Sequence, residues 1–178
     1  MIYLKMRALS AGAVVVLALV VAQQARAQDP GIQESKIKLS WKGGTLHLNE
    51  SGRNHDIPLD GQFDAAEIES VKLRSAKQAK GFIFLLLDVT GPSKVPRDKS
   101  ECGSRNESDL IWLKLDSTWS FKEGSSFLYS SCLLPIATVD GPAWDGEIYR
   151  VTTKNQVATY SSAHPEDGLK VADVGAAK

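Results

Sequence analysis

Residues 82–87 read Phe-Ile-Phe-Leu-Leu-Leu and lie between Gly81 and Gly91. A short, uninterrupted apolar run that is bounded by turn residues is typical of a strand covered on both of its faces. We therefore expect residues 82–87 to form the central strand of the hydrophobic core.

A β-hairpin is predicted upstream of this run. Apolar and polar residues alternate over 36–41 and again over 45–49, and Gly43-Gly44 stands between the two stretches. Alternation with period two on both sides of a Gly-Gly pair is a strong hairpin signal, because glycine readily adopts the positive φ angles of a tight turn. Trp41 falls on the apolar face of the first stretch, so we expect it to pack in the core.

Further short strands follow the apolar run. We expect them at 110–115, 119–122, 126–131, 147–153 and 156–161, with polar turns such as Asp116-Ser117 and Lys154-Asn155 between them. Many short strands joined by polar turns predict a single all-β domain, an antiparallel β-sandwich or barrel of about eight or nine strands. The tail from Ala163 to Lys178 is expected to be partly loose.

The stretch from Asp64 to Arg74 allows two interpretations. Asp64-Ala-Ala-Glu67 has the form of a capping box, which would start a short helix. Val71 and Leu73 alternate with basic residues, which instead predicts a strand that pairs with the apolar run across a turn at 76–80. We favour the strand.

The first 27 residues have the three parts of a secretory signal peptide. Lys5 and Arg7 form a positive region, residues 8–22 are almost wholly apolar, and Ala25-Arg26-Ala27 matches the small-x-small cleavage pattern. The apolar run is shorter than the roughly 20 residues that cross a bilayer. We therefore expect cleavage after Ala27 and a mature domain, residues 28–178, that is periplasmic or secreted and not held on a membrane.

The charge of the chain argues against nucleic-acid binding. The 178 residues balance 21 Lys and Arg against 21 Asp and Glu, and residues 1–27 hold three of the cations and no acid. The mature domain is therefore slightly acidic. Such a charge gives no electrostatic attraction to nucleic acid or to anionic lipid, and the length is that of one domain.

Cys102 and Cys132 are the only cysteines. In an oxidising compartment, an isolated pair is most simply a disulfide. The two residues lack the Cys-x-x-Cys spacing of a redox-active pair, and two distant thiolates do not make a zinc site. We predict one structural disulfide between them.

The chain carries no local catalytic or cofactor motif. It has no Gly-x-Ser-x-Gly, no His-Glu-x-x-His and no phosphate-binding glycine-rich loop, so we assign no catalytic residue, no metal ligand and no cofactor. A catalytic triad can still assemble from distant positions. The only histidines are His47, on the polar face of the predicted hairpin, His55, in a turn-like stretch, and His164. We expect all three at the surface.

Residues 91–108 form the longest predicted connection, and long connections tend to be functional. This segment holds Cys102 and has little apolar content. A polar loop tethered by a disulfide beside a buried strand suits recognition of a partner, and the alternative is a solvated loop whose bridge only adds stability. We call its four basic residues the segment cations and predict that they contact a ligand: Lys94, Arg97, Lys99 and Arg105.

Trp112 and Trp144 are the other candidate binding residues. Trp112 shares a strand face with Lys114, and Trp144 lies in a turn-rich stretch, 140–146, that could expose it. Flat aromatic faces suit pyranose rings, so these two side chains could stack on a carbohydrate. Core packing is the alternative for both.

The sequence as a whole predicts an exported β-domain that binds a protein or a carbohydrate ligand, chiefly through its loops. The alternatives are a small extracytoplasmic hydrolase and a structural protein of the cell envelope. A cleft that brings a histidine within hydrogen-bond reach of a serine or an aspartate would favour the hydrolase.

Overall fold

The computed structural model describes residues 32–59, 68–92, 106–131, 134 and 136–175, which contain strands and two short 3₁₀ turns. Within these residues eleven strands form three sheets, all of them antiparallel. The predicted all-β, antiparallel class is therefore confirmed. The predicted signal peptide, both cysteines and the segment cations lie outside the described residues.

The N-terminal sheet is a three-stranded meander. The 3₁₀ turn η1 (Glu34–Lys36) leads into β1 (Ile37–Lys42), β2 (Thr45–Glu50) and β3 (Arg53–Pro58). The predicted hairpin is confirmed, since Lys42 pairs with Thr45 and both intervening glycines have positive φ. Two-residue turns of this kind match the natural twist of the paired strands.

The central sheet has the strand order β4-β5-β6-β7. Its members are β4 (Ser70–Ala79), β5 (Phe82–Pro92), β6 (Asn106–Leu115) and β7 (Phe121–Ser130). The strand interpretation of Val71 and Leu73 is confirmed, although the turn is shorter than predicted. It consists of Lys80 and Gly81, both at positive φ, because β4 stays paired with β5 as far as Ala79.

The C-terminal sheet has the order β11-β10-β9-β8. Its members are β8 (Thr138–Asp145), β9 (Ile148–Thr153), β10 (Gln156–Ser161) and β11 (Lys170–Asp173), with the 3₁₀ turn η2 (Pro165–Asp167) before β11. The tail from Ala163, which the sequence predicts to be partly loose, contains a paired strand up to Asp173. Pairing with β10 holds β11, and the Trp112 indole donates a 2.9 Å hydrogen bond to the carbonyl of Pro165.

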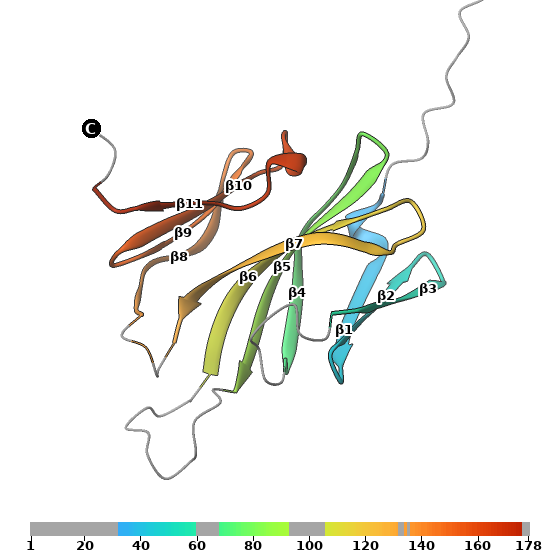
Figure 1. Cartoon of the computed structure of the whole chain (residues 1–178), viewed down its shortest axis with the longest axis horizontal. Helices are drawn as coiled ribbons and strands as arrows, with labels where there is room; N and C mark the ends of the chain where they lie inside the picture. Colours follow the sequence, from blue (N-terminus) through green and yellow to red (C-terminus); the bar gives the residue numbers. More distant parts are fainter. Residues whose placement is uncertain (1–31, 60–67, 93–105, 132–133, 135, 176–178) are drawn as a thin grey trace, which may run out of the picture.

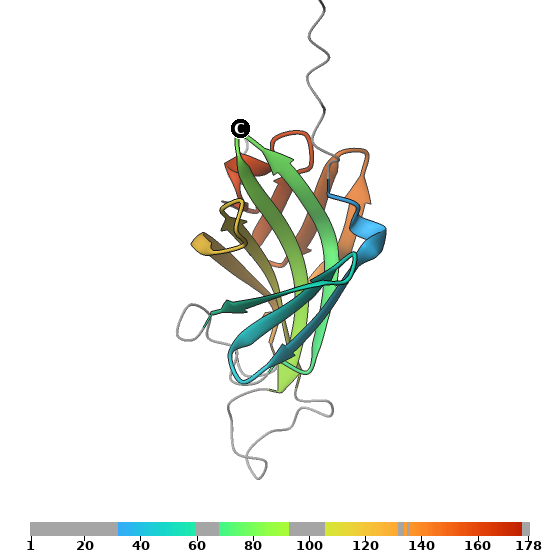
Figure 2. The same cartoon turned by 90° about the vertical axis from the view of Figure 1, so that its right-hand side faces the viewer.

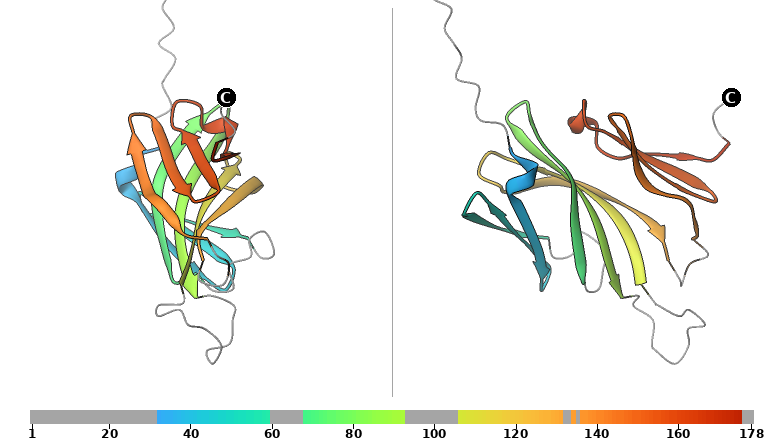
Figure 3. Two further views of the ribbon diagram at one scale, coloured as in Figure 1. Left: turned by 90° about the vertical axis from the view of Figure 1, so that its left-hand side faces the viewer. Right: turned by 180° about the vertical axis from the view of Figure 1, so that it is seen from behind.

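The three sheets are stacked in layers, with the central sheet in the middle (Figure 1). Strands β1 to β3 cross one face of it obliquely (Figure 2), and β8 to β11 cover the other face (Figure 3). Each face has its own buried cluster of side chains. We call the cluster beneath the N-terminal sheet the first core and the one beneath the C-terminal sheet the second core.

The apolar run of β5 supplies both cores. Leu85 and Leu87 point into the first core with Leu46 of β2, whereas Phe84 and Leu86 point into the second core with residues of β9 and β10. Successive side chains of a strand point to opposite faces, so a strand between two layers needs an apolar residue at every position. The prediction that this strand is covered on both faces is confirmed.

The number and bounds of the strands differ from the prediction. The expected strands at 119–122 and 126–131 are one strand, β7, and Trp119 lies in the turn before it at a φ of 65°. Strands β3, β8 and β11 were not predicted, because they contain residues of low strand propensity such as Asn54, Pro142 and Asp173. Partners in the neighbouring strands hold these segments extended. The structure therefore has more strands than the eight or nine expected.

Candidate functional site

The outer face of the N-terminal sheet is polar. Strands β1, β2 and β3 each alternate, and their apolar side chains pack into the first core. The opposite side chains form what we call the polar face: Lys38, Ser40, His47, Asn49, Asn54 and Asp56. The antiparallel registers align them in two rows, Lys38-Asn49-Asn54 and Ser40-His47-Asp56.

Hydrogen bonds between strands hold the polar face in place. His47 Nδ1 lies 2.7 Å from Asp56 Oδ1, and Asn49 Nδ2 donates to Asn54 Oδ1 at 2.6 Å. Asn49 Oδ1 in turn accepts from the backbone N–H of Gly52, at 3.2 Å, in the turn between β2 and β3. The second and third strands are thus linked through side chains in both rows. These contacts fix the side chains of the polar face in the unbound protein, so binding a ligand would cost less side-chain conformational entropy.

The polar face lines an open hollow of about 370 Å³. The side chains of His47 and Asp56 are 39% and 70% exposed, so a ligand could reach both. The Lys38 ammonium and the second Asp56 carboxylate oxygen have no partner among the described residues. The hollow therefore offers both hydrogen-bond donors and acceptors within one surface.

The Ser40-His47-Asp56 row has the residue types of a nucleophile, a base and an orienting acid. His47 occupies the middle strand, with Asp56 on one side and Ser40 directly opposite on the other. Among the described residues, His47 is hydrogen-bonded to Asp56 and not to Ser40. The row therefore contains one of the two hydrogen bonds that a triad requires.

A second group of polar residues is buried between the central and C-terminal sheets. Asp88 of β5 is 7% exposed and accepts from Arg74 of β4, at 2.5 and 3.1 Å, and from the Tyr129 hydroxyl of β7, at 2.7 Å. Burial, with the hydrogen bond to Asp88, raises the pKa of Tyr129 above its ordinary value. Because these polar atoms satisfy one another, this cluster serves the fold.

Tyr149 of β9 packs beside this cluster. Its ring lies beneath the Arg74 guanidinium, 5.8 Å from ring centroid to carbon, and against Trp144 at 5.0 Å. Burial raises the pKa of Tyr149 to about 12. Its hydroxyl is buried and has no hydrogen-bond partner among the described residues. Its ring makes packing contacts while its hydroxyl adds a desolvation cost.

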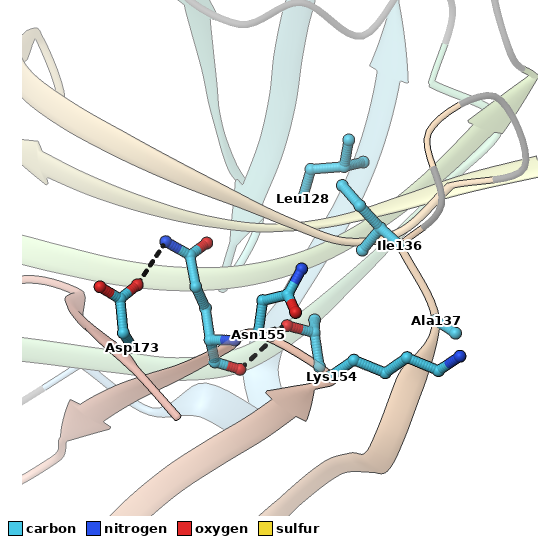
Figure 4. Close-up of a pocket in the computed structure, with 8 residues that line it drawn as sticks. Leu128, Ile136, Ala137, Lys154, Asn155 and Asp173 are labelled. Carbon is cyan, nitrogen blue, oxygen red and sulfur yellow. Dashed lines mark hydrogen bonds between the residues drawn. The ribbon is translucent and has the colours of Figure 1, made fainter. Parts of the chain in front are cut away.

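A pocket of about 270 Å³ lies at the end of the central sheet, beside the β9–β10 turn (Figure 4). Leu128, Ile136 and Ala137 form its apolar side. Its polar side comes from the turn and from β11: Thr153, Lys154, Asn155, Gln156 and Asp173. We call it the sheet-edge pocket.

The two tryptophans that were predicted to bind a ligand differ in their exposure to solvent. Trp112 is 4% exposed, stacks on Phe84 in the second core and hydrogen-bonds to Pro165, so it has no face free for a ligand. Its position on the same strand face as Lys114 does not show whether that face is exposed to solvent or covered by another sheet. Trp144 is 41% exposed on the edge strand β8. It lies in the C-terminal sheet, whereas the polar face belongs to the N-terminal sheet (Figure 1).

His55 differs from its predicted place in a surface turn. Only Ser51 and Gly52 form the turn, and His55 lies in β3 with its ring stacked on Trp119 at 4.6 Å. Its Nε2 atom is buried and has no hydrogen-bond partner among the residues that the structure describes. The inward side of β3 therefore carries a histidine in the first core, whereas the outward side carries Asn54 and Asp56.

Comparison with families of proteins, with curated proteins and with solved structures finds no match to this chain. The fold and the site define an all-β protein of three stacked antiparallel sheets with a polar hollow on one outer face. No group of three or more His, Cys, Asp or Glu side chains suited to a metal occurs in the described ranges. Within the same ranges, no helix is long and apolar enough to cross a membrane.

Proposed function

We propose that the protein is an exported binding module that recognises a polyhydroxylated ligand, such as a saccharide, on the polar face. One observation carries the proposal: six polar side chains from three strands line a single hollow, and cross-strand hydrogen bonds hold four of them in place. Export rests on the signal-peptide pattern of residues 1–27, and one disulfide between Cys102 and Cys132 belongs to the same proposal.

The chemistry of the polar face suits hydroxyl groups. A sugar hydroxyl both donates and accepts, and neighbouring hydroxyls are best bound by side chains with two polar atoms, such as carboxylates and amides. Asp56 and Asn54 provide such groups on β3, each with one polar atom bonded to a neighbouring strand and the other directed to a ligand, while Lys38 provides a cation on β1. Water occupies an open site before binding, so affinity depends on how well fixed groups replace its hydrogen bonds.

A titration followed by NMR tests this proposal. Soluble oligosaccharides of different composition are added to the ¹⁵N-labelled protein, and shifts are expected at 38–40, 47–49 and 54–56. Asn54→Ala and His47→Ala are each expected to weaken binding about tenfold. Each variant removes a hydrogen bond to the ligand, or one that holds an adjacent residue of the polar face in place. His164→Ala, which removes an exposed histidine of the C-terminal region, is the matched control.

Two results would overturn the proposal. One is the absence of shifts at the polar face with every saccharide, and the other is equal weakening by His47→Ala and His164→Ala. Circular dichroism and urea unfolding establish that each variant is folded.

A second candidate function is ester hydrolysis, and the Ser40-His47-Asp56 row is the observation that favours it. In this proposal Ser40 Oγ attacks the ester carbonyl and His47 Nε2 takes its proton, while Asp56 orients the ring. The proton then passes to the leaving alcohol, and water hydrolyses the acyl-serine. Rotation of the Ser40 side chain toward His47 on substrate binding would complete the row, since catalytic hydrogen bonds often tighten only in the complex.

Covalent labelling distinguishes hydrolysis from binding. A fluorophosphonate probe forms a phosphorus–oxygen bond to an activated serine and releases fluoride. Hydrolysis predicts a mass-spectrometric adduct on Ser40 that is lost in His47→Ala and retained in His164→Ala. An unlabelled Ser40 would rule out hydrolysis and leave the saccharide proposal untouched.

A further inference from the structure

The sheet-edge pocket is separate from the polar face and combines an apolar side with a polar rim. Leu128 comes from β7, and Ile136 comes from the lead-in to β8, which pairs with Ser131 as an isolated bridge. Thr138, at the start of β8, donates a 3.0 Å hydrogen bond to the carbonyl of Tyr129. These contacts hold the apolar side of the pocket against the central sheet.

The opposite side of the pocket is a rigid turn. Thr153 Oγ1 donates to the Gln156 carbonyl and accepts from the Gln156 N–H, both at 3.0 Å. The carbonyl of Asn155 accepts from the N–H of Val174 at 2.7 Å, which holds the turn to the chain after β11. The turn is therefore fixed before any ligand arrives, and such preorganisation lowers the cost of binding.

Within the described part of the chain, the two side chains at the tip of this rigid turn have no side-chain partner. Among the described residues, the Lys154 ammonium forms no ion pair and the Asn155 amide forms no side-chain hydrogen bond. The acid of the rim, Asp173, accepts from Gln156 Nε2 at 3.4 Å. Figure 4 shows Lys154 and Asp173 on opposite sides of Asn155. The Lys154 side of the pocket is therefore electropositive and carries unused donors.

Two exposed apolar side chains lie close in sequence to the apolar side of the pocket. Leu134 is 51% exposed and Val139 is 61% exposed, and they flank the pocket residues Ile136 and Ala137 in sequence. Exposed apolar side chains and a pocket with an apolar side and a few polar groups are both typical of binding surfaces.

We propose that the sheet-edge pocket binds a carboxylate that carries an apolar group. The apolar group contacts Leu128 and Ile136, and the carboxylate accepts hydrogen bonds from Lys154 and Asn155. A volume of about 270 Å³ corresponds to about nine water molecules at roughly 30 Å³ each. A ligand portion of about that many heavy atoms fits, which is the size of one C-terminal aliphatic residue or of a medium-chain fatty acid.

Three probes test the chemistry and its source. Octanoate, a short peptide ending in leucine with a free carboxylate, and the same peptide with a C-terminal amide are titrated into the ¹⁵N-labelled protein. Shifts are expected at 128, 136–137 and 153–156, and the amide is expected to bind about tenfold more weakly than the acid, because a hydrogen bond to a charged group is lost. Octanoate and the peptide acid share the chemistry, so the tighter of the two indicates the natural source.

Matched variants complete the test. Lys154→Gln is expected to weaken binding of the preferred acid about tenfold, and Lys154→Arg is expected to retain it. Lys170→Gln, a change at an exposed lysine of β11 that pairs with Asp167, is expected to have no effect. Equal binding of acid and amide, unchanged affinity in Lys154→Gln, or no shift at the pocket with any probe would each overturn the proposal. None of these results depends on the polar face.

Discussion

Leu85 and Leu86 are neighbours in β5 but belong to different cores, so replacing each by alanine tests the layered architecture directly. Both side chains are fully buried. Leu85 lies in the first core, beneath the N-terminal sheet, and Leu86 lies in the second core, beneath the C-terminal sheet. If either outer sheet did not cover the central sheet, one of the two leucines would face water.

The cost of each substitution follows from the buried surface. Leucine to alanine removes three carbon-sized groups, worth about 2.4 kcal/mol at about 0.8 kcal/mol each. The cavity left in a packed core adds to this loss, and the expected destabilisation is about 2–5 kcal/mol for each variant. With a urea dependence of about 2 kcal/mol/M, the unfolding midpoint falls by roughly 1–2.5 M.

Urea unfolding followed by fluorescence and by circular dichroism measures these costs. Leu134→Ala serves as the control, because its side chain is half exposed and its loss should cost no more than about 1 kcal/mol. A cost below about 1 kcal/mol for either Leu85→Ala or Leu86→Ala would refute the three-layer arrangement. The variant with the small effect would identify the face that is not covered.

Three further predictions concern side chains and pH. Tyr129→Phe should cost about 1–3 kcal/mol in urea unfolding, because Asp88 loses a donor. Tyr149→Phe should be neutral or stabilising, because its hydroxyl has no hydrogen-bond partner among the described residues. The pKa of Tyr149 is raised to about 12, so the unfolded chain loses this proton first as the pH rises. The contribution of this raised pKa to the free energy of unfolding is fully present below about pH 10 and is lost between about pH 10 and 12. In Tyr149→Phe, the decline of stability with pH in this range should be shallower by one proton. Thiol titration of the denatured, unreduced protein should find neither Cys102 nor Cys132 reactive, and two reactive thiols per chain would exclude the predicted disulfide.

Local patterns were enough to place several elements. The Gly43-Gly44 pair and the alternation on both sides predicted β1 and β2, and the apolar run at 82–87 predicted a strand between two layers. These signals depend on side-chain periodicity and on the backbone freedom of glycine, both of which act over a few residues. Such information needs no knowledge of distant parts of the chain.

The candidate sites depend on contacts that no local pattern contains. His47 meets Asp56 only because β3, which has low strand propensity, pairs with β2 in one register, and a slip by one residue would turn Asp56 toward the core. Arg74 reaches Asp88 at a register shift in β4. Trp112 appeared free because alternation reports the face of a strand and not what lies above it, and in the structure the C-terminal sheet covers that face. Register, bulges and the stacking of sheets are set by the packing of the whole chain, so the meeting of these residues was decided by tertiary structure.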